Sequence, residues 1–280
     1  MPEKKVIGII GGMGPEATAD LFLKIVRSTP ARKDQEHLRI VIDNNPEIPD
    51  RTTFILGKGP DPRPHLFRTA KNVEKMGASF MAIPCNTAHY FHKEIQAVVG
   101  VPVLHIMRET AAHLKGKVQR AGVLASTGTL KTRLYEDALR DVGIEALVPS
   151  GRDQDEVMEA IQSVKAGDYV KGRELALRQG ARLAASGAQA VIAGCTEIPL
   201  VLHGGDLEVP VVDATQILAE RCVRVALGDP VAGGRNSPKT PSRKGTRGEE
   251  GPRRRQSGFI PKAPKVARRI VNPRGNRKGR

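Results

Sequence analysis

Short apolar runs alternate with longer amphipathic segments along most of the chain. The runs are rich in Val, Ile, Leu and Ala, which is typical of strands buried in a parallel sheet. The expected strands are residues 6–10, 38–43, 79–84, 103–104, 120–125, 146–148, 190–193 and 211–213, and the expected helices are residues 15–28, 52–56, 65–76, 135–142, 153–165, 170–186 and 214–227, with one more after residue 87. Strands that alternate with helices predict an α/β fold with parallel sheets.

This pattern occurs twice. Residues 6–18 align with 120–132, and residues 82–87 align with 192–197, so that each half places a cysteine just beyond the end of a strand. The duplication predicts two similar Rossmann-like domains related by a pseudo-twofold axis, one of residues 1–108 plus 212–228 and one of residues 109–211. Because ligands of open α/β sheets bind beyond the carboxyl ends of the strands, we expect Cys85 and Cys195 to face one cleft.

The net charge of +15 is concentrated at the C-terminal end. Residues 229–280 contain 16 Lys/Arg and 3 Asp/Glu, which leaves the first 228 residues almost neutral. This Pro-, Gly- and Ser-rich tail has too few apolar side chains to form a core, and we expect it to be disordered. Arg253, Arg254, Arg255 and their basic neighbours could bind nucleic acid or another polyanion without sequence preference, or the tail could be a solvated extension without function.

The three cysteines are too few to form a disulfide scaffold. The apolar run at residues 6–10 is too short for a signal sequence or a membrane span. These features indicate a cytoplasmic protein with reduced thiols that does not associate with membranes. Cys222 lies in the middle of a predicted helix and is interpreted as structural, whereas Cys85 and Cys195 are candidates for chemistry.

Two thiols at matched positions suit the racemisation of an amino acid. The reaction needs a base on one face of the α-carbon and an acid on the other, and a thiol whose pKa is lowered from about 8.5 can act as either near neutral pH. Both cysteines precede a predicted helix, and helix N-termini favour the thiolate. The competing interpretation is that each cysteine is a small buried residue of the core.

The glycine loop at residues 11–17 has three interpretations. Gly12, Gly14 and Ala17 match the dinucleotide-binding fingerprint, with Asp43 as the acid for the ribose, which would indicate an NAD-dependent oxidoreductase. The loop could instead bind a substrate carboxylate through its backbone N–H groups, or it could be a plain tight turn. The dehydrogenase interpretation leaves the matched cysteines unexplained.

Three motifs resemble the aspartate/glutamate racemase family, and the aspartate racemase branch most closely. They are IIGGMGPEAT at residues 9–18, PCNTAH at 84–89 and GCTEIPL at 194–200, and the resemblance covers about residues 4–228. It implies two similar α/β domains with the active site between them, an amino-acid substrate, a homodimer, and neither a metal nor pyridoxal phosphate or another cofactor. It also implies that Cys85 and Cys195 are the two acid/base groups.

The same resemblance places further residues at the site. Met13, Asn86, Thr87 and Thr196 match substrate-binding positions, and Arg51 and Lys165 match cations that recognise substrate carboxylates. Gly12, His89 and Glu197 are expected to contact these residues and hold them in position without binding the substrate themselves. His89 could instead be a surface or capping residue of a helix, and Glu197 could orient Thr196, tune Cys195 or cap the next helix.

The expected function is therefore interconversion of L- and D-aspartate, or of the glutamate enantiomers. Maleate isomerases and hydantoin racemases of the same superfamily use related cysteines and remain alternatives. Arylmalonate decarboxylases are disfavoured, since they should need only one thiol.

Overall fold

The computed structural model describes residues 4–231. The predicted tail therefore lies outside the described residues except for its first three positions. Within residues 4–231, no helix combines the length and the apolar character that crossing a membrane requires.

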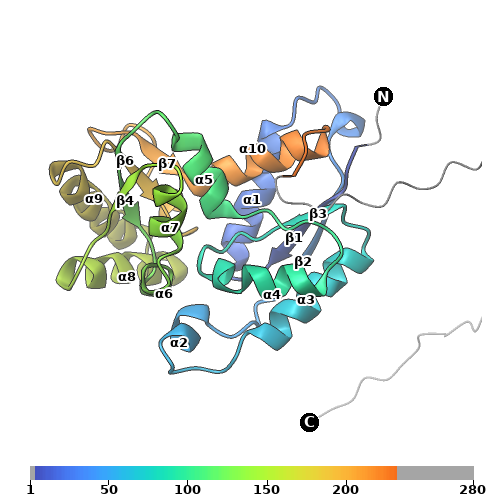
Figure 1. Cartoon of the computed structure of the whole chain (residues 1–280), viewed down its shortest axis with the longest axis horizontal. Coiled ribbons are helices and arrows are strands. Elements are labelled where there is room, and N and C mark those ends of the chain that lie inside the picture. The colour runs from blue at the N-terminus through green and yellow to red at the C-terminus, as the bar shows by residue number, and fades with distance from the viewer. Residues whose placement is uncertain (1–3, 232–280) are drawn as a thin grey trace, which may run out of the picture. The chain divides into compact units, whose positions relative to one another are not determined.

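The first half of the chain builds a parallel sheet of three strands in the order β2-β1-β3 (Figure 1). Its strands are β1 (Ile7–Gly11), β2 (Ile40–Asn44) and β3 (Phe80–Ala82). Its helices are α1 (Pro15–Ser28), α2 (Arg51–Ile55), α3 (Arg63–Lys75), α4 (His92–Val98) and α5 (Ile106–Leu114), with 3-10 turns at Asp34–Glu36 and Thr87–Phe91. The predicted strand at 103–104 is reduced to a single bridge between Met81 and Val103.

The second half repeats this arrangement. Its four parallel strands have the order β5-β4-β6-β7 and comprise β4 (Arg120–Leu124), β5 (Glu145–Leu147), β6 (Ala190–Ala193) and β7 (Val211–Asp213). The helices are α6 (Thr127–Lys131), α7 (Leu134–Arg140), α8 (Arg152–Lys165), α9 (Tyr169–Ala185) and α10 (Ala214–Ala226), with a 3-10 turn at Ile198–Leu200. In both sheets the first strand in sequence lies between the second and the third, as the duplication predicts.

The last strand and the last helix belong to different halves. β7 pairs with β6 in the second sheet, whereas α10 packs against α1 and α5 of the first half. The expected domain boundary between residues 211 and 212 therefore cuts through β7, because this strand completes the second sheet before the chain returns. Asp213 marks the return: its carboxylate caps α10 through the N–H groups of Thr215 and Gln216 and pairs with Lys24 of α1 at 2.7 Å.

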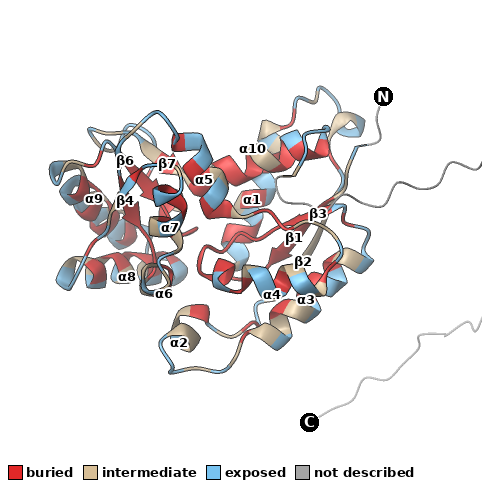
Figure 2. Cartoon of the chain, viewed as in Figure 1, coloured by how far each residue is buried: buried red, intermediate tan, exposed pale blue. Residues whose placement is uncertain are grey.

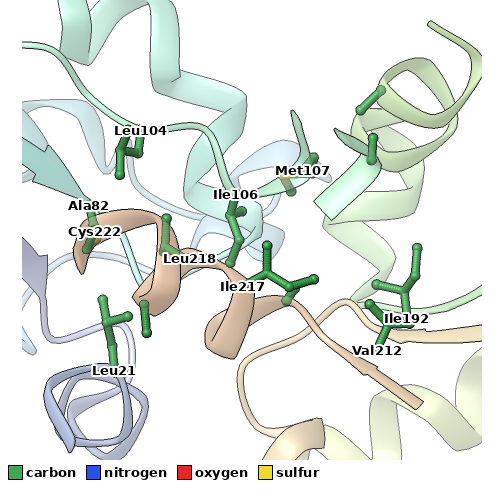
Figure 3. Close-up of a cluster of buried hydrophobic side chains, with 14 of the residues drawn as sticks. Leu21, Ala82, Leu104, Ile106, Met107, Ile192, Val212, Ile217, Leu218 and Cys222 are labelled. Carbon is green, nitrogen blue, oxygen red and sulfur yellow. The ribbon is translucent and has the colours of Figure 1, made fainter. Parts of the chain in front are cut away.

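One hydrophobic cluster includes side chains from both sheets and from α10. Ile9 of β1 and Ile192 of β6 belong to it, as do Ile217 and Leu218 of α10. Figure 3 shows these α10 side chains between Leu21 of α1 and Val212 of β7. Figure 2 shows that the central strands of both sheets are buried. The two halves thus share part of their core, and their relative position is fixed by packing.

Gly12 shows why the glycine loop after β1 needs its glycines. Its φ is +95°, and a Cβ added there would lie 2.3 Å from the backbone of Asn45. The Gly12 N–H also donates to Thr18 Oγ1 at 2.9 Å, which ties the loop to α1. Close approach of the loop after β2 therefore explains this glycine without a bound dinucleotide.

Replacing Gly12 by alanine is expected to lower the free energy of unfolding by about 3 kcal/mol or more, because a clash with backbone adds to the strain of a positive φ. Gly116→Ala is the matched control, since its φ is +75° but no atom lies within 4 Å of an added Cβ. This control should lose only about 1 kcal/mol. Urea unfolding followed by circular dichroism measures both values, and equal losses would contradict the steric explanation.

Candidate active site

Both candidate thiols lie just beyond strand ends, as the sequence indicates. Cys85 follows β3, Cys195 follows β6, and both side chains are buried, with 5% and 8% of their surfaces exposed. Cys222 is fully buried within α10 in the shared core, in agreement with a structural role. All three cysteines are free thiols.

A cavity of about 400 Å³ is lined by both Cys85 and Cys195. The side chains expected to bind substrate from the sequence all line the same cavity: Met13, Arg51, Asn86, Thr87, Lys165 and Thr196. Glu197 lines it as well, whereas Gly12 and His89 are not among its lining residues. Residues more than 180 positions apart in the sequence thus meet around one space.

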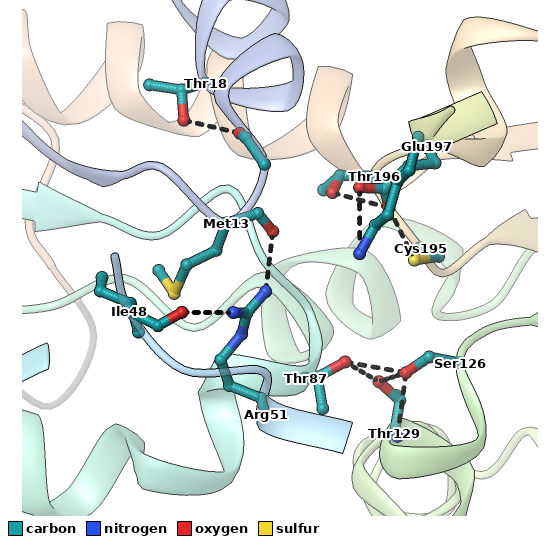
Figure 4. Close-up of polar contacts among 12 residues, drawn as sticks. Met13, Thr18, Ile48, Arg51, Thr87, Ser126, Thr129, Cys195, Thr196 and Glu197 are labelled. Atoms are coloured by element: carbon teal, nitrogen blue, oxygen red, sulfur yellow. Dashed lines mark hydrogen bonds and ion pairs between the residues drawn. The ribbon is translucent and has the colours of Figure 1, made fainter. Parts of the chain in front are cut away.

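Glu197 contacts Cys195 directly. The Cys195 thiol donates a hydrogen bond of 2.9 Å to Glu197 Oε2, and Lys165 Nζ lies 3.7 Å from Glu197 Oε1 (Figure 4). The Thr196 hydroxyl donates a longer bond of 3.5 Å to the same carboxylate. Glu197 is only 5% exposed, so this carboxylate and its thiol partner interact largely out of water.

This environment corrects the expectation that the pKa of Cys195 is lowered by a helix N-terminus. Burial and the adjacent Glu197 carboxylate raise the pKa of the Cys195 thiol well above its ordinary value, and Lys165 offsets this only in part. The structured segment after Cys195 is a 3-10 turn of three residues, Ile198–Leu200, which is too short to provide a strong dipole. At neutral pH Cys195 is therefore a thiol and a proton donor.

Cys195 is accordingly expected to react slowly with iodoacetamide at neutral pH, with a rate that rises with pH only above the range of an ordinary thiol, about 8.5. Glu197→Gln removes the negative charge and is expected to lower the thiol pKa and to accelerate alkylation without changing access. Peptide mass spectrometry reports modification of Cys195 specifically. The same pH profile in both proteins would show that Glu197 does not control this thiol.

Two cations face the cavity from opposite halves. Arg51 begins α2 and is 7% exposed. Its guanidinium donates to the carbonyls of Met13 and Ile48 at 3.2 Å (Figure 4) and to that of Pro49 at 3.1 Å. Its Nε has no partner among residues 4–231. Lys165 ends α8; burial alone would lower the pKa of its ammonium, but Glu197 and the two thiols outweigh burial and raise it. Both side chains therefore carry positive charge.

Residues that the sequence did not single out hold the segment after Cys85. The Thr87 hydroxyl lies 2.8 Å from Ser126 Oγ and 3.0 Å from Thr129 Oγ1. Tyr135 donates a hydrogen bond of 2.8 Å to Asn86 Oδ1. Ser126 caps α6 and Thr129 lies in its first turn, and residues 126–129 align with the glycine loop of the first half. The internal duplication was therefore a signal that could have identified Ser126 and Thr129.

His89 links the backbone at Cys85 to the backbone at Ile106. Its Nδ1 lies 2.9 Å from the Cys85 carbonyl, and its Nε2 accepts a 3.2 Å bond from the Ile106 N–H. An acceptor at Nε2 places the ring proton on Nδ1. Burial, together with the nearby His92, lowers the pKa of His89 to about 3, so the imidazole is neutral. Among residues 4–231, no group of three or more His, Cys, Asp or Glu side chains could hold a metal ion.

Two parallel-sheet halves with paired thiols at one cavity define an enzyme of the racemase class, and comparison with known families agrees. The sequence profile described as Asp/Glu/hydantoin racemase matches residues 10–222. The chain belongs to this family, which confirms the resemblance seen in its cysteine and glycine motifs.

Individual relatives align over nearly their full length. Among solved structures, an aspartate racemase from Picrophilus torridus is 33% identical, has a TM-score of 0.73, and the match covers 79% of this chain and 94% of that one. An aspartate racemase homologue from Pyrococcus horikoshii is 27% identical, with a TM-score of 0.65 and coverages of 80% and 99%. A broad specificity amino-acid racemase, RacX, from Bacillus subtilis (strain 168) is 28% identical over 229 residues, 79% of this chain and 98% of the relative.

Proposed function

We propose that the protein interconverts L- and D-aspartate, and glutamate by the same chemistry, without a cofactor, using Cys85 and Cys195 on opposite faces of the substrate. The observation that supports this most is one cavity lined by both thiols and by the cations Arg51 and Lys165. An acidic amino acid carries two carboxylates, which suit a site with two cations. The family and its aspartate racemase members agree with this chemistry.

Glu197 gives Cys195 a route to its thiolate form. The Cys195 proton is already hydrogen-bonded to Glu197 Oε2, so it can pass to the carboxylate and leave a thiolate beside a neutral acid. The thiolate then removes the α-proton from one face, and the Cys85 thiol delivers its proton to the other face and ends as a thiolate. Proton exchange with solvent returns Glu197 and Cys85 to their starting states. In the opposite direction Cys85 is the thiolate and Cys195 donates.

Arg51 is built to hold a carboxylate in a fixed position. Its Nη atoms are held by three backbone carbonyls, so little side-chain freedom is lost when a ligand binds. Lys165 adds a second charge from the other half and stabilises the negative charge shared by Cys195 and Glu197. Binding of a dicarboxylate would thus draw on residues from both halves.

The proposal is tested by incubating the purified protein with L-aspartate, and separately with L-glutamate, in D₂O without added cofactor. Chiral chromatography should detect the D-enantiomer, and mass spectrometry should find deuterium at Cα of that product. Maleate and a 5-substituted hydantoin are the parallel substrates for the two alternatives. Fumarate from maleate, or hydantoin racemisation, without any D-aspartate or D-glutamate would replace the proposal by that alternative.

A wider substrate range has its own support. The cavity of about 400 Å³ falls within the range of pockets that hold drug-sized ligands, and part of its wall consists of Met13, Leu56, Met158 and Ile161. Methionine side chains adapt to ligands of different shape. One relative is described as a broad specificity amino-acid racemase. The D₂O assay extended to methionine, leucine and lysine would reveal such a range through deuterium at Cα.

A further inference from the structure

Tyr135 contacts the segments that carry both thiols. It belongs to α7 of the second half and is fully buried, yet its hydroxyl donates to Asn86, the residue that follows Cys85 in the first half. The Tyr135 ring also lies against the backbone before Cys195, since a Cβ added at Gly194 would be 2.8 Å from Tyr135 Cε2. One rigid side chain therefore connects the two thiol segments, which come from different sheets.

The Asn86 amide is oriented with its oxygen toward the Tyr135 hydroxyl and its nitrogen away from it. Asn86 is only 2% exposed and lines the cavity. Its Oδ1 accepts a hydrogen bond of 2.8 Å from the Tyr135 hydroxyl, and its Nδ2 has no partner among the residues that the structure describes. Because an amide carries its acceptor and its donors on opposite sides, fixing Oδ1 leaves Nδ2 as the free donor. Because Asn86 lines the cavity, an acceptor on a bound ligand would satisfy this buried donor.

The Tyr135 hydroxyl keeps this role at any working pH. Burial is the main cause that raises the pKa of Tyr135 far above the ordinary value for tyrosine, so the hydroxyl stays protonated. The hydroxyl therefore keeps the proton that it donates to Asn86 Oδ1, which a phenolate would lack.

We propose that Tyr135 is a positioning residue that orients the Asn86 amide so that Nδ2 donates to a carboxylate of the substrate, while its ring holds the Cys195 segment in place. This inference rests on the proposed racemase function. It adds a residue from the second half to the machinery around Cys85 and assigns a single ligand chemistry, a carboxylate oxygen, to Asn86 Nδ2.

Tyr135→Phe removes the hydroxyl and keeps the ring against Gly194. We expect KM for aspartate to rise about 10-fold and kcat to change less than twofold. The variant weakens the contact between Asn86 and the substrate carboxylate, and this contact is present in both the ground state and the transition state. Tyr90→Phe is the matched control, since the Tyr90 side chain is exposed and does not line the cavity. Succinate, a dicarboxylate without an α-amino group, serves as a binding probe in calorimetry and should lose affinity to a similar extent.

A double-mutant cycle with Asn86→Ala separates positioning from a general loss of structure. If Tyr135 acts through Asn86, adding Tyr135→Phe to Asn86→Ala should leave KM and succinate affinity unchanged from the single Asn86→Ala variant. Fully additive effects would overturn the proposal.

Asn86→Asp provides a test that does not depend on the folding of a Tyr135 variant. It keeps an acceptor for the Tyr135 hydroxyl but replaces the donor by oxygen, so KM should rise at least 10-fold. The buried carboxylate should also lower the midpoint of thermal unfolding, so KM is measured well below that midpoint. Wild-type KM in Asn86→Asp, or in folded Tyr135→Phe, would overturn the inference. A wild-type protein that racemises no acidic amino acid would instead refute the proposed function.

Discussion

Cys85→Ser and Cys195→Ser are each expected to lower the rate of racemisation by about 10²- to 10⁴-fold, the usual contribution of a general acid or base. A hydroxyl has the size of a thiol but is far too weak an acid to provide a base near neutral pH. Both side chains line the cavity and also belong to buried hydrophobic clusters, so each variant should lose some stability but still fold. Optical rotation of an aspartate solution measures the rate directly.

Cys222→Ala is the control for the two serine variants. Cys222 is the third cysteine and is fully buried in α10 within the shared core, so its removal should cost some stability and leave the rate nearly unchanged. If Cys85→Ser and Cys195→Ser both racemise aspartate like wild type, two-thiol catalysis is refuted. If only one of them is inactive, the reaction uses a single thiol.

Glu197→Gln is expected to lower kcat/KM by about 10- to 10²-fold, because the neutral amide cannot take up the Cys195 proton during the reaction, and this loss outweighs the lower thiol pKa. The two enantiomers have equal free energy, so kcat/KM must fall equally in both directions in any variant. The value of kcat/KM therefore cannot show which of the two proton transfers has become slower, and isotope effects are needed to identify it. For the enantiomer whose α-proton Cys195 removes, the α-deuterium isotope effect should increase.

For the other enantiomer Cys195 donates the proton. There the substrate isotope effect should decrease and the solvent isotope effect should increase, because proton transfer at Cys195 becomes the slow step. Glu94→Gln, on the exposed side of α4, is the matched control and should change neither isotope effect. Isotope effects that change in the same way for both enantiomers would place Glu197 outside the Cys195 half of the reaction.

The strands and the positions of the two cysteines could be predicted from the sequence because they depend on local patterns. Apolar runs followed by small residues identified β1, β4 and β6, and the internal duplication indicated that Cys85 and Cys195 occupy matched strand ends. One cavity is lined by both cysteines and by the six residues expected to bind substrate, whereas Gly12 and His89 do not line it. Their individual roles remain predictions until variants are measured.

Other features depend on contacts that no local pattern encodes. The bond between Tyr135 and Asn86 joins residues 49 positions apart, and the contact between Thr87 and Ser126 joins residues 39 apart. The raised pKa of Cys195 results from burial and from the orientation of Glu197, neither of which can be derived from the spacing of the two residues. For the same reason the expected domain boundary fell inside β7, since the pairing partner of this strand is chosen in three dimensions.

The return of α10 to the first half has a consequence for how the protein can be divided. A chain cut after β7 would leave one half without the helix that covers α1 and α5, and the other with apolar side chains exposed where the common cluster was. The repeats are thus no longer exchangeable modules, although they retain the same strand order. Either unit expressed alone would need a different segment to cover this region.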